Sequence, residues 1–460
     1  MSIRISLAVA TLAAASAFAV APDIDNHARP FIDSKRVVAL SVGVIKDGKS
    51  IDRHFGQLSI EDKTKPDIDT FYEIGSVTKV FTTTLLSDMV KRGQVKLDQP
   101  VEQLLDDRFE IPQFKKRKIT LRDLATHQSA LPRMPHNFAP KDPKNPYATY
   151  SELRLIVGLA ETKLKRSPGE KYAYSNLGMG LLGHALSKKA GKPYEQLIID
   201  RIAKPLGMKD TKITFAKADR PRIATGYDAA HNEWPNWDLN SLSAAGAIRS
   251  TVRDMLRFVD ANLKLDTKAP INDAMKLTQT RQAGTGMGSI ALGWHIARDG
   301  TTYWHNGQTG GYHSYIAFNR KFNIGVVVFA QIGRTQWRPR HIAWTRSMDP
   351  DAFREKFRAA RIVVAHAGMG TIIKARESGK PIIVMPRRAD VGEHRNDHQL
   401  ATARQLRELG AVSVAFDEQE LIGQLENLDR IKASAAIDAH ASNRLIHTLS
   451  NFIQTGSMAA

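Results

Sequence analysis

The sequence predicts an α/β (α+β) domain whose antiparallel sheet is flanked by helices and a helical subdomain, followed by a small Rossmann-like parallel α/β unit. Three observations indicate this. Strand-like segments occur at residues 37–44 and again at 301–329, with a largely helical stretch between them. Beyond residue 350, short apolar strands alternate with helices, as in parallel βαβ units. The 460 residues, 42% of them hydrophobic, suffice for two or three globular domains.

Residues 1–21 are typical of a secretory signal peptide. Arg4 precedes an apolar run at residues 5–15, and small residues follow at positions 17–19. Cleavage is expected after Ala19 or Ala21, and the run is short for a membrane span, although a retained anchor is the alternative. We therefore expect a periplasmic or secreted protein that is not transmembrane after the signal is removed.

Composition and charge exclude several classes of site. The chain has no cysteine, so it forms no disulfide, thiolate metal site or cysteine nucleophile. Its net charge is +19, of which about +2 lies beyond residue 350. The basic first part could associate with an anionic cell wall, or it could be a solvated surface without a partner. No stripe of alternating aromatic and basic residues indicates nucleic-acid binding.

The first part of the chain contains the elements of one sheet. Residues 37–44 are predicted to be a strand that turns back at Asp47-Gly48 into a hairpin. Residues 76–263 are mostly helical, with a Pro- and Asn-rich loop at 131–146 that could border a binding site. Further strands are predicted at residues 301–304, 312–318 and 324–329, the last two forming a hairpin around residues 319–323.

The string Ser76-Val77-Thr78-Lys79 places a hydroxyl and an amine one helical turn apart. A lysine that is partly desolvated and near other cations can be neutral and accept the serine proton. Apolar residues recur at helical spacing over residues 77–90, so Ser76 is predicted at the start of a buried helix, after a turn at Gly75. There the helix dipole favours an oxyanion. On these residues alone, an N-cap serine beside a surface lysine is an equal alternative.

Two further strings supply what a serine nucleophile needs. Tyr174, in Tyr174-Ser175-Asn176, can share a proton with Ser76 and protonate a leaving group, and Asn176 can hydrogen-bond a substrate amide. The string His305-Asn306-Gly307-Gln308 follows a predicted strand and precedes two glycines. Gly307 lets substrate approach the backbone, and the Gln308 N–H could complete an oxyanion hole. Singly, a loop tyrosine and a turn histidine are the simpler interpretations, but together and in this order the strings favour catalysis.

These strings resemble the serine β-lactamase and penicillin-binding protein family, most closely its class C branch with D-alanyl-D-alanine peptidases and related esterases. The resemblance covers about residues 32–335. The matching strings lie at residues 72–79, 121–132, 174–178, 205–208, 245–251 and 305–307. The resemblance implies a β-lactamase/transpeptidase-like fold and a serine hydrolase domain over residues 22–340.

The resemblance also implies roles. Ser76 would be the acylated nucleophile, Lys79 and Tyr174 the base and acid, and Asn176 and His305 substrate contacts. The oxyanion hole would be formed by the N–H groups of Ser76 and Gln308, with Gly307 among the substrate-binding residues. No metal or organic cofactor is implied. The substrate is a small molecule or a peptidoglycan peptide: a β-lactam, a D-Ala-D-Ala peptide or a short-chain ester. A penicillin-binding protein that deacylates slowly is a further alternative.

Two positions depart from the family. His305-Asn306-Gly307 stands where β-lactamases usually carry Lys-Thr-Gly, which weakens the case for binding a lactam carboxylate strongly. Peptidase or esterase activity is then at least as well supported. Ala130 replaces a glycine of the usual Ser-Gly-Leu-Pro string, so we expect that loop to differ.

Residues 349–460 form a second predicted domain. Strands are expected at residues 361–365, 381–386 and 411–416, and helices at 369–377 and 396–409. Over about residues 349–452 this part resembles the C-terminal domain of family 28 glycosyltransferases, of which it is a partial copy.

The second resemblance implies nucleotide binding where a strand joins a helix. The candidate residues are His366, Gly368, Gly370, Thr371 and Gln399. Lys374 stands where the family often has an acidic ribose ligand, and export would separate the domain from nucleotide sugars. We expect an inactive appendage that could retain a binding site.

The junction between the two parts raises a packing question, because the hydrolase family normally ends in a helix that packs on its sheet. We expect either residues 337–346 or residues 351–359 to cover that sheet face.

Overall fold

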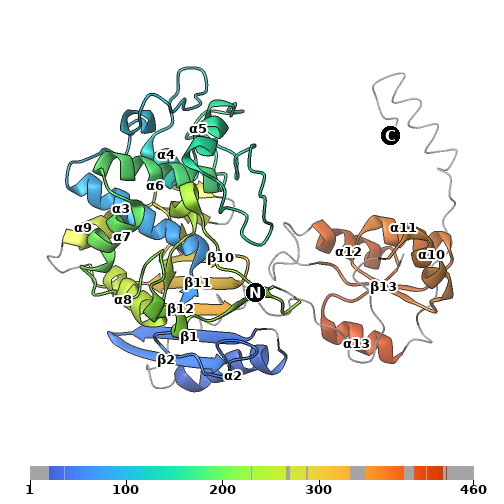
Figure 1. The fold of residues 1–460 in the computed structure, drawn as a ribbon. Helices are drawn as coiled ribbons and strands as arrows, with labels where there is room; N and C mark the ends of the chain where they lie inside the picture. The colour runs from blue at the N-terminus through green and yellow to red at the C-terminus, as the bar shows by residue number, and fades with distance from the viewer. Residues whose placement is uncertain are drawn as a thin grey trace, which may run out of the picture. The chain divides into compact units, whose positions relative to one another are not determined.

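The computed structural model describes residues 20–35, 37–228, 230–265, 270–285, 288–331, 348–387, 398–410, 412–427 and 431. Described residues up to 331 belong to one compact unit, and those from 348 onward belong to a second (Figure 1). Most of the predicted signal peptide lies outside the described residues, and Ala21 lies in helix α2 (Val20–Asp33). Within the described part of the chain, no helix is long and apolar enough to cross a membrane.

An eight-stranded antiparallel sheet forms the centre of the first unit. Its order is β2-β1-β12-β11-β10-β9-β8-β7. The strands are β1 (Ala39–Lys46), β2 (Lys49–Gly56), β7 (Ala283–Thr285), β8 (Gly288–Ile290), β9 (His295–Ile296), β10 (Thr302–Gln308), β11 (Tyr312–Asn319) and β12 (Ile324–Gln331). Because β1 pairs with β12, for example Val42 with Val328, the two ends of the unit close one sheet, as predicted.

The observed strands differ from the predicted ones in two respects. Strands β7, β8 and β9 were not predicted, since two or three residues are too few to show a period of two. Strand β10 continues through Gln308, so the string from His305 to Gln308 lies within the strand and not after it. The hairpin turn at Asp47-Gly48 is as predicted, with φ of +50° and +77° at the two residues.

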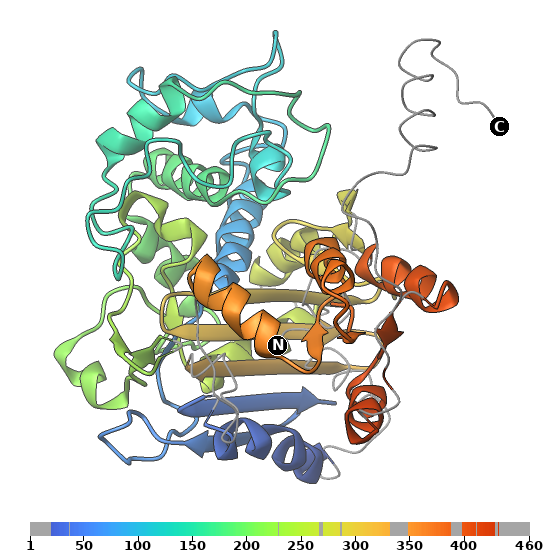
Figure 2. The same ribbon diagram turned by 90° about the vertical axis from the view of Figure 1, so that its right-hand side faces the viewer.

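Helices surround this sheet on both sides (Figures 1 and 2). They are α2, α3 (Thr78–Lys91), α4 (Leu121–Ala125), α5 (Glu152–Ala160), α6 (Asn176–Ala190), α7 (Tyr194–Ile198), α8 (Val252–Leu263) and α9 (Pro270–Thr278). Short helical turns are η2 (Gly75–Val77), η3 (Val101–Leu104), η4 (Ile199–Ala203), η5 (Lys217–Arg222) and η6 (Asn240–Ala245). Two small strand pairs join β3 (Tyr72–Glu73) to β6 (Arg249–Ser250) and β4 (Gly226–Tyr227) to β5 (Glu233–Trp234).

Helix α8 packs closely on one face of the sheet because glycines face it. A Cβ at Gly43 would lie 2.7 Å from Val252 Cγ1, and one at Gly325 would lie 2.1 Å from Val259 Cγ1. Because glycine has no Cβ, the helix axis lies closer to the strands than a larger residue at either position would permit.

The opposite face is also buried, as shown by Leu40, Val42 and Val328, and α2 packs over β1 and β2. Of the two segments expected to cover a face of the sheet, residues 351–359 contribute Phe357 to the core of the second unit. Residues 337–346 lie outside the described residues.

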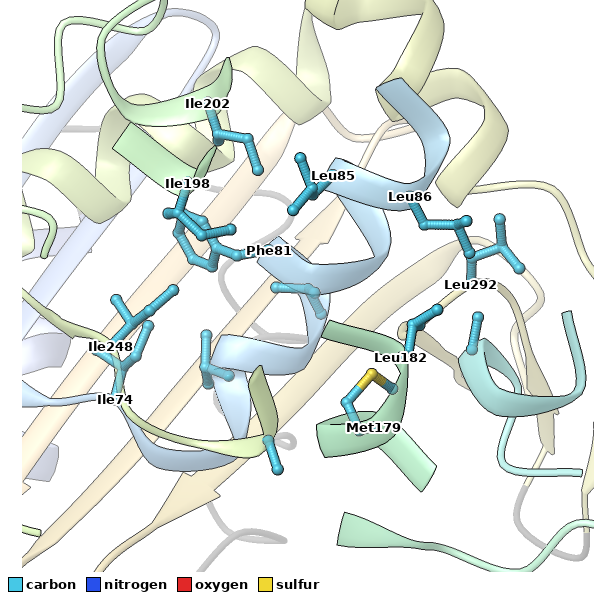
Figure 3. Close-up of a cluster of buried hydrophobic side chains, with 14 of the residues drawn as sticks. Ile74, Phe81, Leu85, Leu86, Met179, Leu182, Ile198, Ile202, Ile248 and Leu292 are labelled. Carbon is cyan, nitrogen blue, oxygen red and sulfur yellow. The ribbon is translucent and has the colours of Figure 1, made fainter. Parts of the chain in front are cut away.

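Helix α3 is the centre of the largest core cluster. In Figure 3, Phe81 and Leu85 point toward Ile198 and Ile202, and Leu86 lies beside Leu292 on another side of the helix. The ring of Phe81 also stacks on Phe258 of α8, with centroids 4.2 Å apart. The helix is therefore enclosed by the sheet side and by the helical subdomain at once.

The second unit is a three-stranded parallel sheet in the order β13-β14-β15, as predicted. Its strands are β13 (Val363–Ala365), β14 (Ile382–Val384) and β15 (Ser413–Val414). Its helices are α10 (Pro350–Ala359), α11 (Met369–Glu377), α12 (His398–Glu408) and α13 (Glu418–Glu426). Its core cluster includes Phe357, Ile372, Ile382, Val384 and Val414.

The replacement of a family glycine by Ala130 has a conformational cost. Ala130 has φ of +63°, in the left-handed region that glycine occupies readily and that costs an L-residue about 1–2 kcal/mol. The loop keeps a backbone shape suited to glycine although it carries alanine.

Ala130→Gly is therefore expected to raise the free energy of unfolding of the first unit by about 0.5–1 kcal/mol, since relief of strain exceeds the added entropy of the unfolded chain. Tryptophan fluorescence during urea unfolding measures this, because all six tryptophans precede residue 345. Ala139→Gly is the control: Ala139 is exposed and does not have a positive φ, so it should lose stability. If both variants lost the same free energy of unfolding, the proposed backbone strain at Ala130 would be contradicted.

Candidate active site

Ser76 is positioned by a tight turn between a strand and the buried helix. Strand β3 pairs with β6, Ile74 N–H donates to Ile248 O (3.0 Å), and Gly75 turns the chain with φ of +49°. From Thr70 to Met89 every residue is buried except Ser76, which is partly exposed. The fold thus presents one hydroxyl at the surface of an otherwise buried segment.

Lys79 contacts Ser76 from within the core. Its Nζ lies 2.9 Å from Ser76 Oγ and donates to Ala245 O at 2.6 Å, and the side chain is 0% exposed. Burial lowers the pKa of Lys79 well below its usual value, and the nearby positive charge of Arg133 lowers it further. A neutral amine at this distance can accept the Ser76 proton.

Tyr174 contacts the other side of Ser76. Its hydroxyl donates to Ser76 Oγ at 2.7 Å, and its ring centroid lies 4.8 Å from Lys79 Nζ. Burial raises the pKa of Tyr174 above its usual value. The phenol therefore keeps its proton, so it can donate a hydrogen bond or serve as a general acid.

Strand β10 passes directly beside the turn that carries Ser76. A Cβ at Gly307 would lie 2.0 Å from Ile74 O, and one at Gly75 would lie 2.8 Å from Gln308 N. Ser314, on the neighbouring strand, donates from its hydroxyl to Ile74 O at 2.6 Å. This approach brings the Gln308 backbone to the same turn as the Ser76 N–H, the two donors predicted for an oxyanion hole.

His305 is a buried, neutral histidine and not a cation. It is 1% exposed, and burial lowers its pKa well below the usual value, with smaller contributions from His295 and Lys79. Its Nδ1 lies 2.7 Å from Asn306 O. Since a carbonyl only accepts, Nδ1 carries the proton, and the buried Nε2, which has no partner among the described residues, is an acceptor.

Asn176 lies at the first turn of α6, next to Tyr174. Ser175 caps this helix, since its hydroxyl oxygen accepts from Gly178 N–H at 2.8 Å. The Asn176 amide nitrogen contacts Met134 Sδ at 3.5 Å, whereas its buried Oδ1 has no partner within the described residues. An unused amide oxygen is what recognition of a substrate N–H requires.

The structure adds neighbours that sequence reasoning missed. The ring of His127 lies 4.4 Å from that of Tyr174, and the ring of His295 lies 5.3 Å from that of His305. Burial lowers the pKa of His127, and lowers that of His295 to about 4, so both are neutral. His127 belongs to the family-like string at residues 121–132, so the resemblance could have indicated that it lies near the site. His295, on the two-residue strand β9, gave no such indication.

The candidate nucleotide-binding residues of the second unit lie at one edge of its sheet. His366 follows β13, and Gly368 precedes α11, which carries Gly370 and Thr371. The His366 ring folds over Gly368, where a Cβ would lie 2.4 Å from His366 Cε1.

Gln399 begins α12, and its Oε1 accepts from Arg387 N–H at 3.1 Å, just beyond β14. Because parallel strands end at the same edge, Gln399 lies on the side of the sheet where His366 lies. Binding by these residues stays a prediction.

The chain is similar to β-lactamases and D-alanyl-D-alanine peptidases. The family model described as Beta-lactamase matches residues 24–346. The D-alanyl-D-alanine-carboxypeptidase/endopeptidase AmpH of Escherichia coli K12 is 30% identical over 322 residues, covering 66% of this chain and 82% of the relative. A β-lactamase of Pseudomonas fluorescens is 26% identical over 346 residues, with coverage of 67% and 92%.

Solved structures agree with these matches. A β-lactamase/D-alanine carboxypeptidase from Yersinia pestis superposes with a TM-score of 0.61 and 26% identity, covering 70% of this chain and 95% of that one. A class C β-lactamase from Rhodobacter sphaeroides gives a TM-score of 0.59 and 25% identity, with coverage of 69% and 95%.

The second part of the chain matches another family. The model of the glycosyltransferase family 28 C-terminal domain matches residues 323–454. The first residues of this match form β12, which pairs with β1 and β11 in the first sheet. The two matches thus overlap at a strand that belongs to the first unit. The Beta-lactamase match covers more than half of the chain, and it therefore decides the family. The chain belongs to the Beta-lactamase family and is a serine hydrolase.

Proposed function

We propose that the protein is an exported serine acyl hydrolase that forms an acyl-enzyme on Ser76 and acts on D-alanyl-D-alanine-type peptides or β-lactams. The observation that carries this is the placement of Ser76 Oγ, 2.9 Å from Lys79 Nζ and 2.7 Å from the Tyr174 hydroxyl. The names of the E. coli and P. fluorescens relatives support the two substrate classes. The signal-like residues 1–21 support export.

Acylation starts from neutral Lys79. Ser76 Oγ bonds to the substrate carbonyl carbon while its proton passes to Lys79 Nζ. The N–H groups of Ser76 and Gln308 stabilise the charge that develops on the carbonyl oxygen. The C–N bond then breaks, the leaving nitrogen takes a proton from the Tyr174 hydroxyl, and the proton held on Lys79 restores that hydroxyl.

Deacylation repeats these steps with water. Water attacks the acyl carbonyl and gives a proton to the Lys79–Tyr174 pair, the bond to Oγ breaks, and Ser76 regains its proton as the free acid leaves. Asn176 Oδ1 and His305 Nε2, both acceptors without a partner in the described residues, are available to accept hydrogen bonds from substrate donors. The steps need no metal or organic cofactor.

Intact mass measured after mixing the mature protein with benzylpenicillin tests this proposal. We expect an adduct of one penicillin mass that is lost in Ser76→Ala. Lys79→Arg should slow its formation by about 10²- to 10⁴-fold, because a guanidinium stays protonated and cannot act as the base. Lys91→Arg, at the exposed end of the same helix, should leave the rate unchanged.

The fate of the adduct separates the remaining alternatives. Rapid loss indicates a hydrolase that turns over lactams, whereas an adduct that persists indicates a slowly deacylating penicillin-binding protein. If no adduct forms and penicillin is not consumed, the proposal is wrong as stated, and Ser76-dependent cleavage of a short-chain ester would then identify an esterase.

The dependence of kcat/KM on pH should reflect the shifted pKa values of Lys79 and Tyr174. Lys79 is active when neutral, and burial lowers its pKa, so kcat/KM rises with pH through this lowered pKa and reaches its plateau well below the ordinary lysine pKa of about 10.4. The raised pKa of Tyr174 extends the plateau to high pH. A rate that rises only near the ordinary lysine value of about 10.4 would contradict a neutral Lys79.

Gly307→Ala should abolish acylation, because its Cβ would meet Ile74 O at 2.0 Å and push β10 away from the turn that holds Ser76. The initial rate of adduct formation measures the effect, and fluorescence-monitored unfolding shows whether the variant folds. Gly370→Ala, where nothing lies within 4 Å of the new Cβ, is the matched control. Full activity in a folded Gly307→Ala protein would show that this approach is not needed.

A further inference from the structure

The site around Ser76 lacks a fixed positive charge where relatives usually have one. His305 takes the place of the family lysine and is neutral, since it is buried and its Nδ1–H donates to Asn306 O. Lys79 is neutral as well, because burial lowers its pKa. Neither group can bind a substrate carboxylate as an ion pair.

Arg133 is a cation that lies close to the reacting groups. Its guanidinium Cζ lies 4.9 Å from the ring centroid of Tyr174. Its positive charge also lowers the pKa of Lys79 and of His127. The side chain is exposed, and within the described ranges no carboxylate forms an ion pair with it. A solvent-facing guanidinium without a carboxylate partner is free to bind one from a ligand.

The backbone of Arg133 is held by the same helix start that positions the proposed acid. Asn176 N–H donates to Arg133 O at 2.9 Å, and Ser175 Oγ donates to the preceding carbonyl, Pro132 O, at 2.6 Å. The side chain rests on Tyr174 as a cation on an aromatic face. Arg133 is therefore fixed relative to Tyr174 and Asn176, although it belongs to a loop.

We propose that Arg133 binds a carboxylate of the substrate and so makes this enzyme selective for anionic acyl substrates. The inference rests on the proposed function of Ser76. An arginine suits this role because its planar guanidinium can donate two parallel hydrogen bonds to a carboxylate. Both substrate classes proposed above carry such a group, in the terminal D-alanine or beside the lactam ring, and a carboxylate on the acyl side would present the same chemistry.

The test compares compounds that differ only in charge. We would measure the rate of Ser76 acylation, by intact mass, with benzylpenicillin, with its neutral methyl ester, and with a penicillin methyl ester that carries a side-chain carboxylate. Benzylpenicillin compared with its methyl ester tests for recognition of a carboxylate on the leaving side. The third compound compared with the same methyl ester tests for recognition of a carboxylate on the acyl side. The variants are Arg133→Gln, Arg133→Lys and Lys144→Gln, the last removing one positive charge from the same loop, over Trp234.

We expect the wild type to react with at least one anionic compound roughly 10- to 100-fold faster than with the neutral ester. Arg133→Gln should bring that ratio close to one without slowing the neutral ester, Arg133→Lys should retain part of it, and Lys144→Gln should leave it unchanged. Rates are compared on the pH plateau, so that a shift in the pKa of Lys79 does not enter.

Three results would overturn the proposal. The wild type could acylate all three compounds equally, Arg133→Gln could slow all three equally, or Lys144→Gln could abolish the ratio as fully as Arg133→Gln. The second result would mean that Arg133 supports acylation of every substrate alike and does not recognise substrate charge. A failure of the proposed function is distinct, because then no compound would give a Ser76-dependent adduct.

Discussion

The burial of Lys79 is the constraint on which the site depends. A lysine at 0% exposure is costly as a cation. Among the residues that the structure describes, its amine hydrogen-bonds Ser76 Oγ and Ala245 O, and neither of these is a counter-ion. The fold therefore holds the amine in its neutral form, which is the form that can take a proton. The helix that carries Lys79 is enclosed on several sides by apolar residues, so the packing that stabilises the core also lowers the pKa of the proposed base.

Precision in this site comes from backbone contacts, because it is built between segments that are distant in sequence. Ile74 accepts from Ser314 and donates to Ile248, and Gly307 touches its carbonyl directly. The turn bearing the nucleophile is thus held by the last strands of the sheet. Closure of one sheet from both ends of the unit therefore brings Ser76 beside the backbone of Gln308, its proposed oxyanion donor.

Much of the fold could be predicted from the sequence, because its determinants are local. The Ser76–Lys79 spacing, the apolar period of α3 and the alternating strands of the second unit are visible in short windows. The two-residue strand β9 is too short to be visible in such a window, so the position of His295 beside His305 could not be predicted either. Arg133 was missed because its proximity to Tyr174 is a tertiary contact without a sequence period. The resemblance supplied roles that spacing alone left balanced between alternatives.

The distribution of charge around Ser76 separates chemistry from recognition. The groups that we propose to move protons are Lys79 on α3 and Tyr174 just before α6, and burial lowers the pKa of the neighbouring histidines His127, His295 and His305. On strand β10 the neutral His305 stands where the family usually carries a lysine. A positive charge near Ser76 is that of Arg133, which lies on a loop. Loops tolerate substitution better than buried strands. A cation on a loop can therefore change substrate preference without altering the packing around a buried residue, and it acts on the pKa of that residue only through its charge. The separation is incomplete, because the positive charge of Arg133, which we propose to bind substrate, also lowers the pKa of Lys79.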